Sequence, residues 1–341
     1  MIAPLLLTLA AATTLVPTRV FDAVETRAGT IFIADQNKAL RVSTDNGATF
    51  NLVPGFVGQA RSGALVENEL GELLVGTSVA LGAQPSIYVC TPTACKFAGN
   101  PPEARDAVTG FVRQPGGVVL AINGHSQVMH RSTDQGHSWA VYTPKLPAPM
   151  GQAYTIEQDP VLGLLIGGEI GAVGRSVDGG KTWTNFGLMR HSPGVPGEAR
   201  GNLWALTTDP VTGVVLAAIN DDITPGNPGA AGSIQRHLPT DPDGVWHLTT
   251  GTYYDQIATF AVQPDGSLIA SGIYPSPNST GHVYKSNDAG GTWTEISSTI
   301  GIAFRGSVRT FAGPSGRLYF SYGLALARSP VGGYCCHSGS F

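Results

Sequence analysis

The eight residues STDQGHSW, at positions 132–139, belong to a motif that recurs along the chain. Ser, Asp, Gly and an aromatic residue occupy the first, third, fifth and last positions of this octet. The other clear copies are STDNGATF at 43–50, SVDGGKTW at 176–183 and SNDAGGTW at 286–293. A short motif that recurs at regular intervals is typical of an array of equivalent structural units. The octet therefore predicts a repeat architecture.

The residue types of the octet suit the tight turn of a β-hairpin. An Asp side chain accepts backbone N–H bonds within a turn, and Gly supplies a positive φ. The terminal aromatic ring can fill the space between neighbouring sheets. We therefore expect structural roles for Asp45, Asp134, Asp178 and Asp288. Calcium loops also contain Asp-x-Gly turns, but we expect no metal here.

The four octets resemble the Asp-box, or bacterial neuraminidase repeat, of the sialidase-like β-propellers. In that family the boxes lie on the rim of the propeller, away from the ligand. The resemblance implies a propeller fold and supports a structural role for the octets. It does not identify the ligand, because the shared motif is a turn and not a binding site.

The number of units follows from two independent patterns. Degenerate octets begin at Cys90, Pro239 and Ser329, between or after the clear ones. A Gly-led apolar run precedes every octet, and these runs begin at Gly29, Gly71, Gly116, Gly163, Gly213, Gly266 and Gly316. Each run is typical of the second strand of a four-stranded unit, joined to the first strand by a short turn. The sequence thus predicts an all-β fold, a seven-bladed β-propeller of four-stranded antiparallel blades.

The domain organisation leaves one question open, which concerns residues 1–17, MIAPLLLTLAAATTLVP. This apolar stretch has the length and the small-residue ending of a signal peptide, but it lacks a positively charged start. The alternative is a strand that closes the ring, since little chain follows Cys336 to complete the last unit. We expect residues 18–341 to form a single propeller domain.

Composition narrows the class of partners. Charged residues make up 13% of the chain, glycines number 45 and the net charge is −4. Such a chain offers no general attraction to nucleic acid, so we expect no nucleic-acid partner. A turn-rich β-protein of this kind suits a secreted, periplasmic or cell-surface location. No feature of the sequence calls for a cofactor, and we expect none.

The cysteines form two close pairs. Cys90 and Cys95 stand on opposite sides of a predicted hairpin, where a disulfide would replace the missing Asp of that octet. The vicinal Cys335 and Cys336 have no assigned pairing, and one of them could pair with another chain.

The loop lengths point to one face of the ring. If each octet joins the third and fourth strands of a blade, the opposite face receives the loops between second and third strands and the links between blades. The long insertions fall almost entirely on that opposite face, at 77–85, 142–152, 187–199, 220–232 and 273–281. Long loops on a rigid scaffold commonly build binding surfaces, so this face is the functional candidate.

An Arg stands at or just before the predicted inner strand in most units. These residues are Arg19, Arg61, Arg105, Arg200 and Arg305, while Gln152 and Asp255 take the place in the remaining units. Their guanidinium groups would converge on the mouth of the ring and bind carboxylate or sulfate oxygens. The alternative is that they brace neighbouring blades. Our first hypothesis is a propeller that binds an anionic ligand, either an acidic glycan or an acidic surface of a partner protein.

Catalysis at the same mouth is the second hypothesis. A glycoside hydrolase needs two carboxyls that flank one bond, and the candidates by loop position are Glu169, Glu198, Asp221 and Asp222. A polysaccharide lyase needs a proton acceptor and donor beside an Arg, for which His191, Tyr253 and Tyr254 are candidates near Arg190. Other polar residues that we place around the mouth are Asp35, Lys38, Asn123 and His125. Ordinary solvated loop polarity is the alternative for each of them.

The family resemblance does not extend to sialidase activity. Sialidases have six blades and a Phe-Arg-Ile-Pro segment, whereas the nearest match here is Thr18-Arg19-Val20-Phe21, with the Pro on the wrong side. We therefore do not expect a sialidase.

Seven-bladed relatives include xyloglucan hydrolases, polysaccharide lyases, lectins and photosystem II assembly factors. A third hypothesis is an assembly or scaffold subunit of a larger extracytoplasmic complex. The unassigned Cys335 and Cys336, the apolar N-terminus and the lack of an obvious catalytic signature motivate it. Whether the chain is an enzyme stays open.

Overall fold

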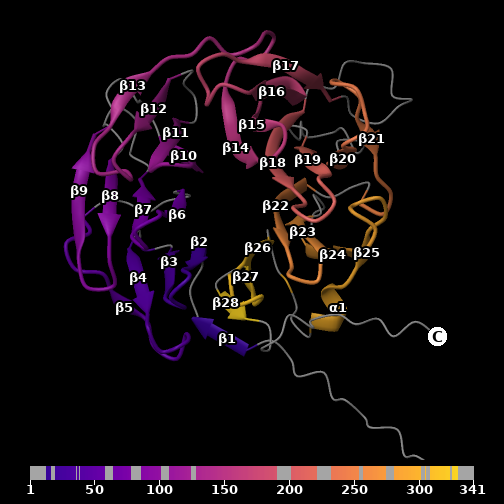
Figure 1. The fold of residues 1–341 in the computed structure, drawn as a ribbon. Helices are drawn as coiled ribbons and strands as arrows, with labels where there is room; N and C mark the ends of the chain where they lie inside the picture. The colour runs from indigo at the N-terminus through magenta and orange to yellow at the C-terminus, as the bar shows by residue number, and fades with distance from the viewer. Residues whose placement is uncertain are drawn as a thin grey trace, which may run out of the picture.

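Seven four-stranded antiparallel sheets form a ring around a common axis (Figure 1). This arrangement confirms the predicted seven-bladed propeller. The computed structural model describes residues 13–16, 20–35, 37, 39–57, 64–77, 86–100, 107–123, 128–189, 201–220, 232–252, 256–273, 280–300, 304, 308–322 and 325–328. Within these residues the helical segments are η1 (Glu169–Gly171) and α1 (Ser297–Ile300).

The blades share one order of strands from the axis outward. The inner strands are β2 (Val20–Glu25), β6 (Leu65–Glu67), β10 (Val108–Gln114), β14 (Ala153–Asp159), β18 (Asn202–Thr208), β22 (Gln256–Val262) and β26 (Val308–Ala312). The second strands are β3 (Ile31–Asp35), β7 (Leu73–Gly76), β11 (Val118–Asn123), β15 (Gly163–Gly168), β19 (Val215–Asn220), β23 (Leu268–Ile273) and β27 (Leu318–Tyr322). We number the blades 1 to 7 in this order.

The third and outer strands complete each blade. The third strands are β4 (Leu40–Ser43), β8 (Ile87–Cys90), β12 (Met129–Ser132), β16 (Ala172–Ser176), β20 (Ser233–His237), β24 (Gly281–Ser286) and β28 (Ala325–Arg328). The outer strands of blades 1 to 6 are β5 (Asn51–Leu52), β9 (Cys95–Gly99), β13 (Ala140–Tyr142), β17 (Thr184–Leu188), β21 (His247–Leu248) and β25 (Thr294–Glu295). The outer strand of blade 7 is β1 (Thr13–Val16), which pairs antiparallel with β28 and so closes the ring.

The antiparallel order gives the ring two different faces. Turns between first and second strands share one face with the octets, and we call it the octet face. Loops between second and third strands share the other face with the links between blades, and we call it the loop face. Every inner strand therefore begins at the loop face and ends at the octet face.

The hydrophobic core lies between blades rather than inside any one of them. Strand β3 is buried along its whole length, and β7, β19 and most of the other second strands are similar. Each cluster of buried side chains joins two neighbours; Phe32 and Val42 of blade 1, for example, pack with Leu73 and Tyr88 of blade 2. Burial on both faces explains why the second strands read as continuous apolar runs.

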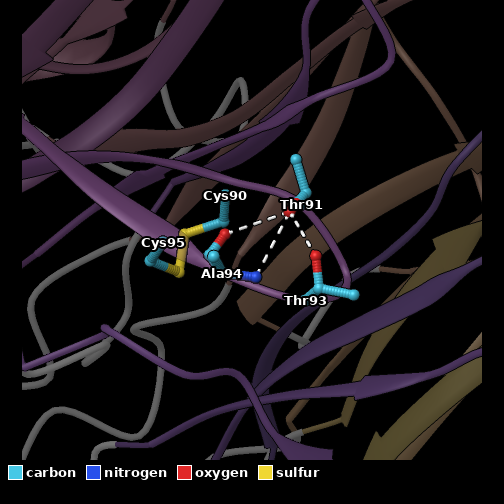
Figure 2. Close-up of a disulfide and its surroundings, with 5 residues drawn as sticks. All are labelled: Cys90, Thr91, Thr93, Ala94 and Cys95. Carbon is cyan, nitrogen blue, oxygen red and sulfur yellow. Dashed lines mark hydrogen bonds between the residues drawn. A yellow bond between two sulfur atoms is a disulfide. The ribbon is translucent and has the colours of Figure 1, made fainter.

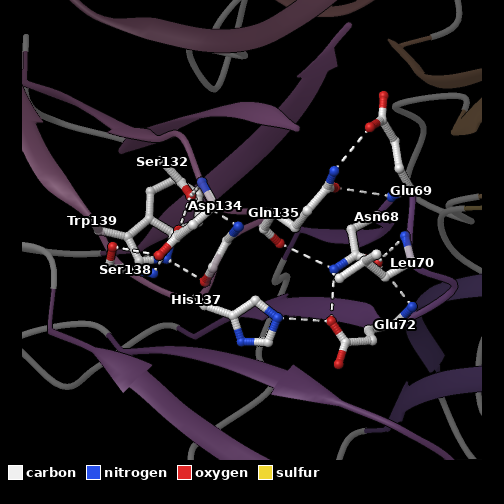
Figure 3. Close-up of polar contacts among 11 residues, drawn as sticks. Asn68, Glu69, Leu70, Glu72, Ser132, Asp134, Gln135, His137, Ser138 and Trp139 are labelled. Atoms are coloured by element: carbon white, nitrogen blue, oxygen red, sulfur yellow. Dashed lines mark hydrogen bonds and ion pairs between the residues drawn. The ribbon is translucent and has the colours of Figure 1, made fainter. Parts of the chain in front are cut away.

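Each clear octet is held by one set of hydrogen bonds, which Figure 3 shows for residues 132–139. Ser132 Oγ donates to Asp134 Oδ1 at 2.7 Å and accepts from Gly136 N at 2.8 Å. Asp134 also accepts from Ser138 N at 2.9 Å and from Ser138 Oγ at 2.6 Å. Trp139 Nε1 donates to Gly136 O at 2.9 Å. These bonds satisfy the turn internally and orient the aromatic ring.

The same octet also binds the preceding blade. Asn68 Nδ2 donates to Gln135 O at 3.0 Å, and Gln135 Nε2 donates to Glu69 Oε2 at 2.8 Å (Figure 3). Gly136 has φ +94°, and a Cβ placed on it would lie 2.5 Å from Cδ2 of the buried Leu74. A side chain at this position would meet both an unfavourable backbone conformation and a filled space.

Basic residues next to the octets brace consecutive blades. Arg175 Nη1 of blade 4 lies 3.2 Å from Asp243 Oδ1 of blade 5. Arg236 Nη1 of blade 5 donates to Asp288 O of blade 6 at 3.2 Å, and Arg328 of blade 7 donates to Asn46 O of blade 1. Arginine bracing between blades is thus a feature of the octet face.

The degenerate octet of blade 5 begins earlier than its sequence suggests. Val215 pairs with His237, as Leu164 pairs with Ser176 in blade 4, so His237 and not Pro239 takes the Ser position. The turn that follows is longer than in the clear octets. Trp246 still packs against Phe186 of the preceding blade, with ring centroids 5.9 Å apart. Blade 5 therefore keeps the aromatic contact of the clear octets without their Ser–Asp–Gly turn.

Blade 2 replaces the octet with a covalent bond. Cys90 and Cys95 face each other across β8 and β9 and form the expected disulfide (Figure 2). Phe97, which the octet frame places in the aromatic position, is 58% exposed and does not fill the gap between blades. The disulfide therefore closes a shorter hairpin than the octets do.

The close approach of octet and neighbouring blade can be tested with two Gly to Ala changes. Gly136→Ala and Gly116→Ala both place a side chain at positive φ, but Gly116 has no atom within 4 Å of the new Cβ. We expect Gly136→Ala to lower the free energy of unfolding by about 2 kcal/mol more than Gly116→Ala, because Leu74 is fixed in the core. Denaturant unfolding measures both values, and equal losses would contradict the proposed contact.

Candidate functional site

The inner strands carry an irregularity close to the loop face. A register shift occurs near the start of β2, β10, β14, β18 and β22. The residues inside these shifts are Phe21, Thr109, Tyr154, Trp204 and Ala258. A β-bulge redirects a side chain that would otherwise point into the sheet packing. Five blades therefore present a redirected side chain near the axis, at the end of the ring where the inner strands begin.

Two of these side chains form a stacked aromatic pair. The rings of Tyr154 and Trp204, on the adjacent strands β14 and β18, have centroids 4.6 Å apart and an interplanar angle of 18°. Trp204 is 48% exposed, in contrast to Trp183 at 8% and Trp293 at 5%. The pair is therefore an accessible aromatic surface and not part of the core between blades.

Polar groups lie beside this pair. Tyr154 Oη donates to Gln152 Oε1 at 3.3 Å, and Glu169 N donates to Gln152 O at 3.0 Å. The Glu169 carboxylate lies against Gly151, where an added Cβ would be 2.1 Å from Oε2. This carboxylate has no hydrogen bond or ion pair with any residue that the structure describes. We call Gln152, Tyr154, Glu169 and Trp204 the mouth cluster.

The backbone that carries Glu169 is strained. Ile170 has φ 54° and ψ 26°, a left-handed conformation that β-branched residues rarely adopt. Gly171 follows at φ +70°, with a virtual Cβ only 2.5 Å from Met189 O. At a residue other than Gly, such as Ile170, a left-handed conformation costs about 1 to 3 kcal/mol, and such residues concentrate at functional sites. The short helix η1 also packs against β18, which brings Glu169 to the strand that holds Trp204.

A carboxyl in the first blade bridges two inner strands. Asp22 Oδ1 accepts from Ala23 N at 2.9 Å, and Oδ2 accepts from Leu65 N of blade 2 at 3.1 Å. Burial raises the pKa of Asp22 to about 7, although the positive charge of Arg309 and the two backbone bonds oppose the shift. Thr259 occupies the matching position in blade 6 and accepts from Thr310 N at 2.8 Å. Asp22 thus joins blades and titrates close to neutral pH.

A second carboxyl of this kind lies on the strand that carries Tyr154. Burial raises the pKa of Glu157 to about 8, and the negative charge of Asp159 adds to the shift. Glu157 follows Tyr154 by three residues on β14, which places it about 10 Å further toward the octet face. Among the described residues it has no hydrogen-bond partner. Glu157 is therefore protonated at neutral pH and able to donate a proton.

Most of the residues singled out by sequence lie outside the described part of the chain. These are the arginines Arg19, Arg61, Arg105, Arg200 and Arg305, and the catalytic candidates Glu198, Asp221, Asp222, His191, Tyr253 and Tyr254. Their roles stay predictions. Glu169 is described and belongs to the mouth cluster, as does Gln152, which takes the place of the Arg in blade 4.

Two polar candidates on the loop face serve their own loops instead. Asp35 is buried, bonds Arg41 Nε at 2.6 Å and accepts from Asn37 N at 2.8 Å. Asn123 is also buried and donates to Val128 O at 3.2 Å. Both side chains close the loop between the second and third strands, so neither is available to a ligand.

The sequence reasoning missed Tyr154, Glu157 and Trp204. A signal was present in the aromatic residues Phe21, Tyr154 and Trp204, which stand near the start of three inner strands. Strand alternation alone would have placed them between blades, because the bulge that redirects them leaves no distinct mark in the sequence.

Neither a metal-binding cluster nor a membrane-spanning helix occurs among the described residues. No three His, Cys, Asp or Glu side chains among them gather closely enough to hold a metal ion. None of the helices in the described ranges is long and apolar enough to span a membrane.

Comparisons with known proteins extend the fold assignment. No protein-family model and no curated protein matches the chain. Similar solved structures include the extracellular domain of the hybrid two component system BT4673 from B. thetaiotaomicron, with TM-score 0.69 and 15% identity over 94% of this chain and 40% of that one. A GH74 xyloglucanase from Xanthomonas campestris has TM-score 0.66 and 13% identity over 94% of this chain and 53% of the enzyme. A PL25 ulvan lyase has TM-score 0.60 and 10% identity, with 95% of each chain covered.

These likenesses show a shared fold. The neighbours are β-propellers that include an extracellular domain, a glycoside hydrolase and a polysaccharide lyase. This chain spans 40% of the BT4673 domain and about half of the xyloglucanase, 53%. The resemblance of the octets to the sialidase-like repeat stays an expectation from sequence.

The raised pKa values of Asp22 and Glu157 predict how stability depends on pH. Because the folded state binds these protons more tightly than the unfolded state, their contribution is complete below about pH 4 and is lost as pH rises through about 7 and 8. We expect Glu157→Gln to flatten the decline of the melting temperature between pH 5 and pH 8.5, roughly the window between these values. Thermal unfolding across this range measures the effect.

Asp178→Asn is the matched control, because hydrogen bonds from Thr182 lower the pKa of Asp178 to about 2. Its contribution is present at neutral pH and is lost only in acid. This variant should reduce the melting temperature without changing the slope between pH 5 and pH 8.5, well above its pKa. An unchanged slope in Glu157→Gln would contradict the shift at Glu157.

Proposed function

We propose that this protein is an extracytoplasmic propeller that binds an acidic glycan at the loop face, around the axis of the ring. One observation carries the proposal: all seven inner strands begin at the loop face. Arg19 directly precedes β2, and Arg200 stands just before Asn202, the first residue of β18. Arg61, Arg105 and Arg305 stand shortly before β6, β10 and β26. This order of residues supports a cluster of positive charge at the mouth.

The chemistry of arginine fits an acidic ligand. A guanidinium group offers a planar fork of donors that matches a carboxylate or sulfate, and several such groups can bind successive acidic units. The chain as a whole carries a net charge of −4, so attraction to an anion has to come from a local cluster. The alternative role for Arg, bracing between blades, is seen in Arg175, Arg236 and Arg328 on the octet face. Arg309 of β26 also braces blades, since it donates to Phe21 O of blade 1 at 3.5 Å.

The location follows from the disulfide. The Cys90–Cys95 bond is typical of oxidising compartments. A structural neighbour is itself an extracellular domain. Both observations favour an extracytoplasmic protein, where polysaccharides are available as ligands.

Arg105→Ala and Arg200→Ala test this function. Each variant should bind polygalacturonate or heparin oligosaccharides about 10-fold to 100-fold more weakly, because a charge-assisted bidentate contact is lost. Isothermal titration calorimetry measures the affinity, and binding by the unmodified protein should weaken as salt increases.

Arg113→Ala is the control for these variants. Arg113 is exposed on β10, the strand that Arg105 precedes, but it lies near the octet end of that strand. Its removal should leave the affinity unchanged. If Arg105→Ala and Arg200→Ala also leave every affinity unchanged, these arginines brace the ring and the proposed function is wrong.

Glu157 favours glycan cleavage as a second candidate function. A carboxyl with a pKa of about 8 is protonated at neutral pH, as a general acid for glycosidic bond cleavage must be. Glycoside hydrolysis also needs a second, ionised carboxyl. Glu169 of η1 lies beside Gln152, about 16 Å along β14 from Glu157, which exceeds the separation of about 5 to 9.5 Å in glycoside hydrolases. The second carboxyl would therefore come from another residue, and the candidates from sequence are Glu198, Asp221 and Asp222.

The catalytic alternative has its own test. If the protein cleaves the oligosaccharides that it binds, Glu157→Gln should slow the release of reducing ends by about 100-fold or more, since the proton donor is removed. Affinity should stay within about 2-fold. Glu72→Gln, on the octet face, is the control and should retain full activity. Undiminished cleavage by Glu157→Gln would exclude Glu157 as the acid.

A further inference from the structure

We propose that Tyr154 and Trp204 form a stacking platform for a pyranose ring, and that Gln152 and Glu169 bind the hydroxyl groups of the same sugar. The inference deepens the proposed function, since it names the part of a glycan that this end of the ring recognises. It rests on the proposed glycan ligand, but its evidence comes from Gln152, Tyr154 and Trp204 and not from the arginines.

Trp204 is exposed, unlike two tryptophans of the octets. Trp183 and Trp293, in the octets, fill gaps between blades and are almost completely buried. Trp204 is 48% exposed although its strand, β18, lies between two blades whose interfaces are otherwise apolar. The bulge in β18 turns this side chain away from those interfaces. A large apolar surface that folding leaves accessible is a common mark of a binding site.

Tyr154 covers one face of the Trp204 ring, and Trp204 is still 48% exposed. Tyr154 stacks on one side of the Trp204 ring, at 4.6 Å and 18°. On the other side the next inner strand is β22, and its bulge residue is Ala258, which has no ring to continue the stack. The face of Trp204 that is turned away from Tyr154 carries the negative side of the aromatic quadrupole. The partly positive C–H groups on the flat side of a pyranose suit this surface.

Polar groups stand at the edge of the platform. Gln152 Oε1 is occupied by the Tyr154 hydroxyl, while its Nε2 has no hydrogen bond within the described residues and can donate one. The Glu169 carboxylate can accept hydroxyl protons. An apolar surface flanked by a few convergent polar groups is the usual composition of a small-ligand site.

Charge decides which part of the ligand fits here. The Glu169 carboxylate would repel a uronate, sulfate or phosphate placed against the platform. The ring that stacks on Trp204 is therefore one that offers hydroxyl groups to Glu169. Acidic groups of the same glycan would lie toward the arginines that precede the inner strands, including Arg200 before β18.

Close packing restricts the backbone around the mouth cluster. Gly168 packs so closely on Gln152 that an added Cβ would lie 2.0 Å from Gln152 O. Ile170 is held in a left-handed conformation beside Glu169. Stacking against the Tyr154 ring also restricts the Trp204 side chain. Side chains that are already ordered lose little entropy on binding, which favours recognition of a weakly interacting sugar.

Trp204→Ala and Trp204→Phe test the platform, with cellohexaose, mannohexaose and hexagalacturonate as probes. For each probe that binds the unmodified protein, Trp204→Ala should weaken affinity about 10-fold or more, and Trp204→Phe should restore part of it. Binding should also protect Trp204 from iodide quenching of its fluorescence. Phe97→Ala, which removes another exposed aromatic ring, from outer strand β9, should leave affinity unchanged. A melting temperature close to that of the unmodified protein shows that each variant folds.

The outcomes separate this inference from the proposed function. Full affinity in Trp204→Ala together with weakened binding in Arg200→Ala would overturn the platform and leave the anionic site intact. The reverse pattern would support the platform and overturn recognition by arginine. If none of the three probes binds at millimolar concentration, or if bound sugar leaves iodide quenching unchanged, the platform is wrong.

Discussion

The structure depends on burial between blades. Each second strand is covered on both faces, so the apolar surface of one blade is buried only when both neighbours are in place. No blade has a core of its own, and stability comes from a closed series of interfaces. The octets fit this constraint. Their internal bonds make a rigid turn, and their Gly and aromatic positions fill the gap to the preceding blade, as Gly136 does against Leu74.

The two faces of the ring therefore carry different tasks. On the octet face, short turns, arginine braces and the Cys90–Cys95 disulfide hold neighbouring segments together. On the loop face, five inner strands begin with bulges that release side chains from the interfaces between blades. The stacked rings of Tyr154 and Trp204 are a direct result of that release. Binding chemistry can vary there without weakening the contacts that close the ring.

The sequence predicted the fold well because the octets and apolar runs encode local turns and buried strands that repeat. It predicted the Cys90–Cys95 bond for the same reason. It misplaced the start of the blade 5 octet, where His237 replaces Ser and the longer turn hides the register. The sequence did not predict the exposure of Trp204 or the desolvation of Glu157, because both depend on neighbouring strands far along the chain. The prediction that Arg105 and Arg200 lie near the mouth of the ring depends on strand order alone.

The pairing of β1 with β28 has a consequence for how the protein folds. Thr13 lies opposite Arg328, so the ring closes only when two segments that lie far apart in the sequence meet. Until β1 and β28 have paired, the ring exposes an open strand edge to other chains. Contacts between such distant segments form slowly. Closure of the ring is therefore a late step in folding.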